Sequence, residues 1–385
     1  MMGQIFPWKS GNRFELLIDG QQFFPVMLTA IARAEHQVAL ELYLVEDGHC
    51  SKALVDALCT AAVRGVRVRC LFDGFGSLRL GSAFRNRLLA AGVLLQVYNP
   101  LRWRRGVRNF HRDHRKILVV DDRVAYVGGT GSTDEFWNPV KQTSLWHEVM
   151  VAVEGPLVAH WQLIFDYQWL ASLGRHPWKP EEAPGLAHLP PYPPMGEGLG
   201  RVAYANARQH RDIVQSLVRS IRTARQRVWL ATPYFLPSWK VRRALIKAAR
   251  RGIEVRLLLT GRRTDHPPVR FAGQRYYPRL LRSGVRIFEY QPRFLHLKMV
   301  LVDEWVSVGS CNFDHWNLRF NLEANLEALD PTLTAAADAC MRQDFIDSRE
   351  ISIDDWQARP WHKRLRQRLW GWLDRLVVNL LDRRR

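Results

Sequence analysis

An internal duplication limits the possible folds of this chain more than any other feature. Residues 61–74 (AAVRGVRVRCLFDG) align without a gap with residues 248–261 (AARRGIEVRLLLTG). Each copy predicts a buried strand, a segment of helical period, a glycine and a second buried strand, at Val38–Val45, Ser51–Arg64, Gly65 and Val66–Phe72 in the first copy and at Val228–Leu236, Val241–Arg251, Gly252 and Ile253–Leu259 in the second. Strand–helix–strand units of this kind are parallel crossovers with helices on the faces of a sheet. The sequence therefore predicts an α/β fold of two duplicated domains with pseudo-twofold symmetry and mostly parallel central sheets flanked by helices.

A proline-rich stretch separates the two copies. Seven prolines fall between Pro177 and Pro194. Because proline removes a backbone donor and interrupts helices, this composition predicts a linker. We therefore expect a first domain at 1–176, a linker at 177–200, a second domain at 201–355 and a C-terminal segment at 356–385.

The chain is strongly basic. It has 385 residues, of which 56 are Lys or Arg and 37 are Asp or Glu, so its formal net charge is +19. A folded protein with this charge favours a polyanion: nucleic acid, an acidic lipid surface or a phosphate-bearing substrate. Charge alone does not choose among the three.

Cysteine usage and hydropathy narrow the cellular context. The five cysteines are scattered and form no C-x-x-C pair, so neither a zinc ribbon nor a disulfide framework is predicted, and a reducing compartment fits best. We find no apolar run of about 18 residues and no secretory signal, so no transmembrane helix is expected. Any membrane contact is therefore expected to be peripheral.

Each copy carries the same spaced triplet, H-x-K-x4-D. Apolar residues fill the spacer and predict a buried strand. Residues i and i+2 of a strand point to the same side, so the histidine and the lysine project together. The aspartate falls on the other face and is expected to fix the strand end or a turn. The triplets are His114, Lys116 and Asp121 in the first copy and His296, Lys298 and Asp303 in the second.

Two His/Lys pairs that meet at one cleft suit a phosphodiester substrate. The lysines would stabilise charge on the non-bridging oxygens, while one histidine attacks phosphorus and the other protonates the leaving oxygen. A metal cluster at residues 111–114 (HRDH) is the alternative. Neighbouring strand residues point to opposite faces, however, and no second ligand set has metal spacing.

Small polar turns and single glutamates follow the triplets. Glycine lets the backbone approach phosphate closely, and Ser, Thr and Asn side chains can hydrogen-bond its oxygens. A nucleophilic imidazole needs an acceptor at its far nitrogen, so the glutamates are candidates for orienting the histidines, with ordinary surface acids as the alternative. The turn candidates are Gly129, Thr130, Ser132, Ser310 and Asn312, and the glutamates are Glu148 and Glu323.

These motifs together resemble the phospholipase D superfamily. The likeness extends over nearly the whole chain and includes the segments ELYLVEDG, TPYFLP and HLKMVLVDEWVSVGSCNFDHWNLRFNLEANLEA. Within the superfamily, the sequence is most similar to the bacterial cardiolipin synthases of the short B type, which lack N-terminal membrane spans. Both triplets match the family motif residue by residue, as do Ser310 and Asn312. The first turn departs, because Gly131 stands where many relatives have Asn, and Thr130 or Ser132 is expected to replace that contact.

The resemblance implies a metal-independent ping-pong reaction. A phosphatidyl group passes from one phosphatidylglycerol to an active-site histidine and then to a second phosphatidylglycerol, with release of glycerol and formation of cardiolipin. By analogy, His114 is the nucleophile and His296 the general acid and then base. The implied partners are anionic phospholipids at the cytoplasmic face of the bacterial inner membrane, with no cofactor and no obligate protein partner. Phosphatidylethanolamine as donor, or free glycerol as acceptor, would need the same residues.

The C-terminal segment at 356–385 predicts a basic amphipathic helix. Its Trp and Leu residues recur at helical spacing and arginines surround them, which is typical of a helix in the headgroup zone of an anionic bilayer. A helix docked on the protein's own core is the alternative.

Two other functions stay open at this level. One is a phospholipase D-type phosphodiesterase or nuclease, in which water attacks the phosphohistidine. The other is a catalytically silent membrane-binding protein, against which the two intact triplets argue. We find no recognised nucleic-acid module or alternating aromatic–basic strand, so the sequence does not favour nucleic acid as a partner.

Overall fold

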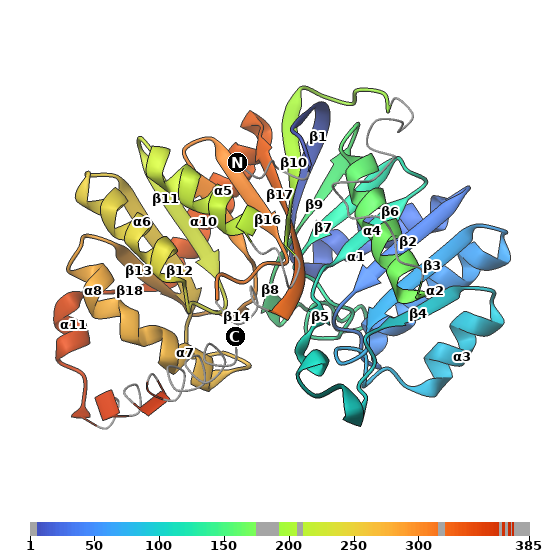
Figure 1. The fold of residues 1–385 in the computed structure, drawn as a ribbon, viewed down its shortest axis with the longest axis horizontal. Coiled ribbons are helices and arrows are strands. Elements are labelled where there is room, and N and C mark those ends of the chain that lie inside the picture. The colour runs from blue at the N-terminus through green and yellow to red at the C-terminus, as the bar shows by residue number, and fades with distance from the viewer. Residues whose placement is uncertain are drawn as a thin grey trace.

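The computed structural model describes residues 6–174, 192–205, 211–314, 320–361, 364–365, 369–370 and 372. Two α/β halves lie side by side (Figure 1). The first half contains β1 (Lys9–Ile18), α1 (Asp19–Arg33), β2 (Gln37–Leu42), α2 (His49–Val63), β3 (Arg67–Asp73), α3 (Ser82–Ala90), β4 (Leu94–Tyr98), the 3-10 segment η1 (Trp103–Phe110), β5 (Arg112–Asp113), β6 (Ile117–Val120), β7 (Val124–Gly128), β8 (Trp146–His147), β9 (Val149–Glu154) and α4 (Val158–Ser172). The second half contains β10 (Gly198–Ala205), α5 (Arg211–Thr223), β11 (Arg227–Thr232), α6 (Trp239–Arg250), β12 (Glu254–Thr260), α7 (Pro267–Gly273), η3 (Gln274–Tyr276), α8 (Tyr277–Leu281), β13 (Arg286–Tyr290), β14 (Phe294–Leu295), β15 (Met299–Val302), β16 (Trp305–Gly309), β17 (Asn321–Leu329), α10 (Pro331–Ile346), β18 (Ser348–Ile351) and α11 (Ile353–Gln357).

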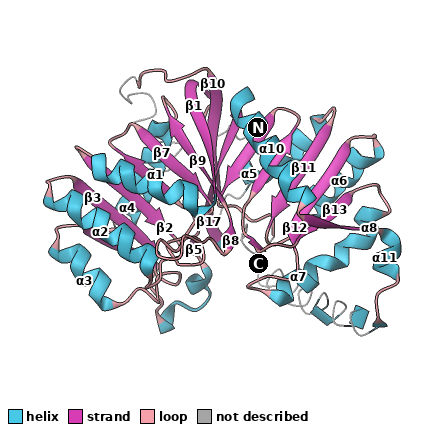
Figure 2. Cartoon of the chain, turned by 180° about the vertical axis from the view of Figure 1, so that it is seen from behind, coloured by secondary structure: helices cyan, strands magenta, loops and turns pink. Residues whose placement is uncertain are grey.

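One sheet runs through both halves. Its strand order is β4-β3-β2-β6-β7-β9-β1-β10-β17-β16-β15-β11-β12-β13-β18. β1 and β10 pair antiparallel at its centre, and the strand order repeats outward from that pair, with β18 as an addition to the second half. Figure 2 shows this arrangement from behind. The topology of the first half is thus repeated in the second, as the duplication predicts.

The prediction of mostly parallel sheets is wrong, because the sheet is mixed. The parallel runs are β2–β3–β4 and β11–β12–β13, as crossover connections require. The strands nearer the centre, including β6 and β15 that follow the His/Lys pairs, run antiparallel to their neighbours. The cause in the first half is a hairpin between β6 and β7. Asp121 and Asp122 have φ of 51° and 54°, and a tight hairpin turn needs positive φ at both central residues.

The two faces of the sheet have separate apolar cores. α1 and α2 pack against the first half and α5 and α6 against the second half, each over its own buried cluster. On the opposite face, α4 and α10 cover a single cluster with members from both halves, including Trp161, Phe165, Met341 and Phe345. Because this core crosses the centre of the sheet, burial of apolar surface holds the two halves in a fixed relation.

The predicted linker and C-terminal helix lie largely outside the described residues. Residues 175–191 and most of 361–385 are among those not described, so the domain limits and the helix stay predictions. Four described apolar side chains of the C-terminal segment are more than half exposed: Trp361, Leu365, Leu369 and Trp372. Two others are not exposed: Trp356 is buried, and Trp370 is half-buried and lines the cavity between the halves. Within the described part of the chain, we find no helix with the length and apolar character that a membrane span requires.

Candidate active site

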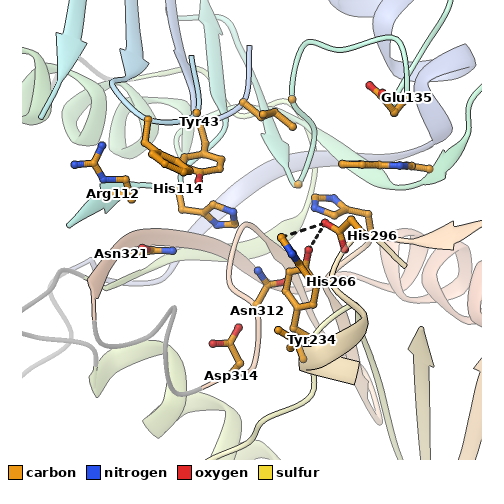
Figure 3. Close-up of a pocket in the computed structure, with 18 of the residues that line it drawn as sticks. Tyr43, Arg112, His114, Glu135, Tyr234, His266, His296, Asn312, Asp314 and Asn321 are labelled. Carbon is orange, nitrogen blue, oxygen red and sulfur yellow. Dashed lines mark hydrogen bonds and ion pairs between the residues drawn. The ribbon is translucent and has the colours of Figure 1, made fainter. Parts of the chain in front are cut away.

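Both histidines and one of the two lysines line a cavity between the halves, and the second lysine, Lys298, lies against His296. Each His/Lys pair lies in the extended segment directly before its strand, β6 or β15. His114, Lys116 and His296 line a cavity of about 1070 Å³, and Figure 3 shows the two imidazoles facing each other across it. Both histidines and both lysines are nearly buried, with Lys116 and Lys298 at 3% and 1% exposure. The structure thus brings together the two pairs that the sequence places 182 residues apart.

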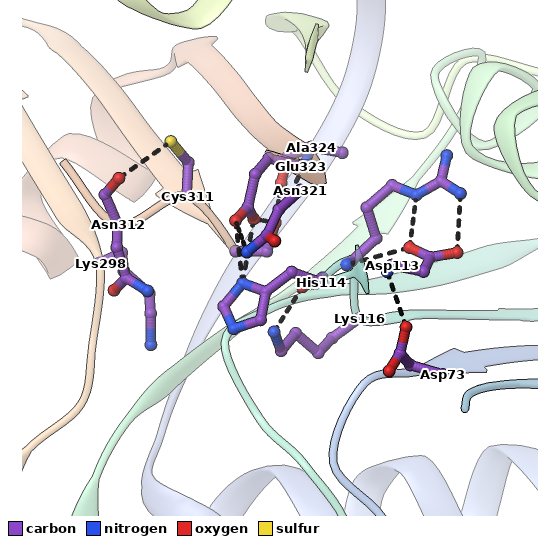
Figure 4. A network of polar contacts seen from close by, with 12 residues as sticks. Asp73, Asp113, His114, Lys116, Lys298, Cys311, Asn312, Asn321, Glu323 and Ala324 are labelled. Carbon is purple, nitrogen blue, oxygen red and sulfur yellow. Dashed lines mark hydrogen bonds and ion pairs between the residues drawn. The ribbon is translucent and has the colours of Figure 1, made fainter. Parts of the chain in front are cut away.

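The first histidine is held by a glutamate of the other half. His114 Nδ1 lies 3.0 Å from a carboxylate oxygen of Glu323 on β17 (Figure 4). Ser310 Oγ donates to the same carboxylate at 2.5 Å, so its position is fixed from a second side. Because Nδ1 is occupied, the free Nε2 is the nitrogen that can react with a molecule in the cavity.

The second histidine shows the reciprocal arrangement. His296 Nδ1 lies 2.5 Å from Glu148 Oε2, at the end of the first half's β8. Lys298 Nζ lies 3.3 Å from the same oxygen. Glu148 and Glu323 are both 0% exposed, so the alternative that they are surface acids is wrong.

Two short parallel strand pairs explain the exchange of glutamates between halves. β5 pairs with β17 and β8 pairs with β14, each across the boundary between the halves. His114 N donates to Leu322 O at 3.0 Å, and His296 N donates to His147 O at 2.8 Å. Each histidine therefore lies next to the backbone that immediately precedes its partner glutamate.

Burial dominates the electrostatics of the four basic groups. Burial lowers the pKa of His296 to about 4, with a further lowering from Lys298, and it lowers the pKa of His114. Burial also lowers the pKa of Lys116 to about 7, against the attraction of Glu323. Burial alone would raise the pKa of Glu148, but Lys298 and His296 outweigh it and bring that pKa to about 2. These shifts favour neutral imidazoles beside an ionised Glu148 carboxylate.

The aspartates of the triplets cap turns instead of contacting the cavity. Asp121 accepts hydrogen bonds of 2.8 Å from three consecutive backbone N–H groups, those of residues 35–37. Asp303 accepts from the equivalent N–H groups of residues 225–227, at 2.8–3.0 Å. Both have positive φ, of 51° and 50°. Each aspartate thus ties the end of its strand, β6 or β15, to the start of the neighbouring strand, β2 or β11.

The polar turn of the second half contributes a side chain to the cavity. Asn312 is 1% exposed and lines the cavity, and neither its Oδ1 nor its Nδ2 has a hydrogen-bond partner among the described residues. A buried amide without partners carries a desolvation cost that a bound phosphate oxygen would remove.

The polar turn of the first half contributes glycine backbone to the site instead of a free side chain. Gly131 lines the cavity, and a Cβ there would lie 2.7 Å from Leu44 O, which leaves no room for Asn. Thr130 Oγ1 donates to Gly131 O, and Ser132 Oγ lies 2.8 Å from Ser51 Oγ, so both hydroxyls are used within the protein. A Cβ at Gly129 would lie 2.2 Å from the carboxylate of Glu148. The first turn therefore makes room for the glutamate.

Sequence reasoning missed several residues that line the cavity. Tyr43 packs its ring against His114, with centroids 4.8 Å apart, and Arg112 lies on the same side (Figure 3). On the other side, Tyr234 Oη donates to Asp265 at 2.5 Å. Tyr43 and Tyr234 lie in the segments ELYLVEDG and TPYFLP, whose aromatic residues at strand ends were the available signal.

Two groups bear on metal binding. In the HRDH segment, Asp113 accepts two 3.0 Å hydrogen bonds from Arg115 and so is not available to a metal beside His114. Elsewhere, ligand atoms of His147, Cys340 and Asp344 lie within 4.8 Å of one another. Burial alone would lower the pKa of His147, but its hydrogen bonds to carboxylates, including Asp344, raise it, and burial raises the pKa of the Cys340 thiol. The His147 imidazole and the Cys340 thiol therefore keep their protons, and the protonated forms of these side chains do not bind metals.

Both halves of the chain are similar in sequence to known proteins. The family model described as "Cardiolipin synthase, PLD-like domain" matches residues 27–169 and 217–345, one match in each half. Cardiolipin synthase B of Salmonella typhimurium is 37% identical over 331 residues, covering 84% of this chain and 78% of its own, and cardiolipin synthase B of Escherichia coli K12 is 36% identical over 83% and 77%. Cardiolipin synthase A of Pseudomonas putida GB-1 is 34% identical over 93% of this chain and 73% of its own.

A solved structure shares the fold of both halves. The crystal structure of phosphatidylserine synthase from Haemophilus influenzae superposes with a TM-score of 0.71 at 14% identity, covering 96% of this chain and 94% of that one. The match extends across the boundary between the halves, where the two His/Lys pairs meet. With a family model on both halves and relatives above 30% identity over most of their length, this chain belongs to the cardiolipin synthases, the phosphatidyltransferases built from phospholipase D-like domains.

Proposed function

We propose that the protein joins two phosphatidylglycerol molecules into cardiolipin through a phosphohistidine on His114. The observation that supports this most directly is the pair of histidines that face one cavity, each held at Nδ1 by a buried glutamate of the opposite half. One imidazole attacks while the other transfers a proton, and a single phosphorus atom between them satisfies both roles.

The first half-reaction releases glycerol. His114 Nε2 attacks the phosphorus of a phosphatidylglycerol, and a P–N bond forms as the P–O bond to the glycerol headgroup breaks. His296, in its protonated form, gives its proton to the leaving oxygen. Burial disfavours this protonated form, and the phosphodiester anion that enters beside His296 favours it. Lys116, Lys298 and the amide of Asn312 stabilise the non-bridging oxygens.

The second half-reaction forms cardiolipin. A headgroup hydroxyl of another phosphatidylglycerol gives its proton to neutral His296 and attacks the phosphorus. The P–N bond breaks, and His114 returns to its starting state. Glu323 and Glu148 hold each ring in the tautomer with Nε2 towards the cavity and stabilise the imidazolium while it exists.

The asymmetry of the cavity supports the assignment of the two histidines. On the His114 side, Phe75 and Leu78 line the cavity and are 51% and 59% exposed, which suits acyl chains that enter from a bilayer. On the other side, Tyr234 and Asp265 offer a hydroxyl and a carboxylate to the hydroxyl groups of glycerol. The leaving headgroup would then lie beside His296, the proposed general acid.

The membrane context is part of the same proposal. We place the protein at the cytoplasmic face of the bacterial inner membrane, in contact with phosphatidylglycerol and cardiolipin. All five cysteines are free, which fits a reducing compartment. The exposed Trp361, Leu365 and Leu369 support contact between the C-terminal segment and a bilayer.

Product analysis tests this function. Purified protein with phosphatidylglycerol vesicles is expected to form cardiolipin and glycerol in equal amounts, and EDTA should leave the rate unchanged. Lipid chromatography and a glycerol assay give both quantities. Phosphatidic acid as the sole lipid product would show that water is the acceptor, and cleavage of plasmid DNA would favour a nuclease. Loss of activity on chelation would contradict metal-free chemistry.

The pH dependence of kcat/KM should report Lys116. Its pKa of about 7 means that the ammonium loses its proton, and its attraction for phosphate, as the pH rises through neutrality. The pKa of His114 is lowered, so this nucleophile stays neutral down to pH values below 6.5. We expect kcat/KM to fall above about pH 7, and Lys116→Arg to shift this alkaline limb upward because a guanidinium keeps its charge. Rates on a soluble short-chain substrate measure the profile. An unchanged limb in the arginine variant would assign it to another group.

A further inference from the structure

A basic and apolar segment, Leu101–Phe110, projects beside the cavity. Its sequence, LRWRRGVRNF, contains four arginines and no acidic residue. Trp103 is 100% exposed, Phe110 is 62% exposed and Leu101 is 45% exposed. Large apolar side chains with this much exposure, grouped within ten residues, mark a binding surface more often than a solvated loop.

The segment is a folded loop that holds these side chains in the open. Asn109 Nδ2 donates to Arg102 O at 2.9 Å, and Asn109 Oδ1 accepts from Arg102 N at 3.2 Å, which closes the loop on itself. Asn99 Nδ2 donates at 2.8 Å to the carbonyl oxygens of both Arg108 and His111. Gly106 supplies the positive φ of 48° at the bend. These bonds oppose a collapse of Trp103 onto the protein.

The loop lies next to residues that line the active-site cavity. It leads directly into β5 and His114, and its Phe110 packs against Phe320 from the second half, with ring centroids 6.0 Å apart. Arg112, which lines the cavity, donates to Asn99 O at 2.9 Å. In Figure 1 the teal loop projects at the lower edge, below β5, on the same side of the molecule as α7, which lines the cavity.

The chemistry of the loop fits an anionic bilayer. Trp favours the boundary between headgroups and acyl chains, and arginine pairs with lipid phosphates. The exposed arginines Arg102, Arg104 and Arg108 surround the apolar side chains, as in segments that lie on acidic membranes. A nucleic-acid surface would need the arginines but would not need three large apolar groups exposed to water.

We propose that Leu101–Phe110 is a membrane-docking loop, which inserts Trp103 and Phe110 among the headgroups of an anionic bilayer and holds the cavity entrance against the surface. The exposed Phe75 and Leu78 continue this apolar surface into the cavity. A lipid can then pass from the bilayer to His114 with its acyl chains in apolar contact. This docking role rests on the proposed function, because it delivers lipid to the active site. Binding of the protein to vesicles can nevertheless be measured without turnover.

Vesicle binding by the full chain tests the loop. Trp103→Ala should weaken cosedimentation with phosphatidylglycerol-containing vesicles at least tenfold. Arg102→Gln with Arg104→Gln should weaken it by about fivefold per charge, with little change towards neutral phosphatidylcholine vesicles. Val63→Ala is the matched control, because Val63 is 76% exposed but lies at the end of α2 remote from the cavity. This control should bind like the wild type.

A soluble substrate separates docking from folding and from catalysis. Activity on monomeric short-chain phosphatidylglycerol should be unchanged in Trp103→Ala, because Trp103 does not line the cavity. Wild-type vesicle binding by this variant would overturn the proposal, as would an equal loss of binding and of soluble activity, or Trp103-dependent binding to nucleic acid in place of vesicles. If the wild type binds vesicles through the loop but forms no cardiolipin, the docking role of the loop is supported and the proposed function is wrong.

Discussion

Replacement of His114 by alanine should lower kcat by about 10⁵–10⁶-fold, because no other group can form the covalent intermediate. Replacement of His296 should cost about 10²–10⁴-fold, the usual contribution of one positioned general acid–base group. Initial rates of cardiolipin formation from short-chain phosphatidylglycerol measure both effects. Circular dichroism of each variant checks that the fold is retained.

The two losses differ in their response to the leaving group. The p-nitrophenyl ester of a phosphatidic acid loses p-nitrophenolate, an anion that needs no proton to leave. Release of p-nitrophenolate should therefore recover in His296→Ala and stay absent in His114→Ala. The opposite result would assign His296 as the nucleophile. If His296→Ala kept most of its activity on phosphatidylglycerol, a shared cleft with two distinct roles would be wrong.

Glu148→Gln and Glu323→Gln should each lower kcat by about 10³–10⁴-fold. An amide cannot stabilise the imidazolium and permits the wrong tautomer, as in other His–carboxylate pairs. Steady-state rates give the size of the effect. Glu46→Gln is the matched control, because Glu46 also lines the cavity but its carboxylate pairs with Arg79, at 3.4 Å, and not with a histidine. This control should stay within a few-fold of the wild type.

Double variants test the exchange of glutamates between halves. Glu148→Gln should add little to His296→Ala, since the carboxylate acts through that ring, but Glu323→Gln should lower the remaining rate further because it acts through His114. Glutamates that served the histidine of their own half would give the reverse pattern, and that result would contradict the observed pairing.

Local spacing made the duplicated triplets predictable from the sequence. The H-x-K pairs, the turn glycines and the two α/β units depend on residues close together in the chain, whose preferences act locally. The prediction of parallel sheets failed because it extended the crossover pattern of β2 and β3 to strands that fold back as hairpins.

Long-range pairing could not be read from the sequence. His114 and Glu323 are 209 residues apart, and His296 and Glu148 are 148 apart. Each pairing depends on a two-residue strand, β5 or β14, which is too short to give a periodic signal. The role of Gly131 was equally hidden, since it depends on the closeness of Leu44 O.

Identification of the covalent intermediate tests the shared cavity most directly. His296→Ala, mixed with the p-nitrophenyl ester of a short-chain phosphatidic acid, should release one equivalent of p-nitrophenol per chain in a burst and then turn over slowly. Mass spectrometry of the quenched protein should find one phosphatidyl group per chain, on His114. Two groups per chain, an adduct on another residue, or turnover with no adduct at all would contradict a single phosphorus held between the two imidazoles.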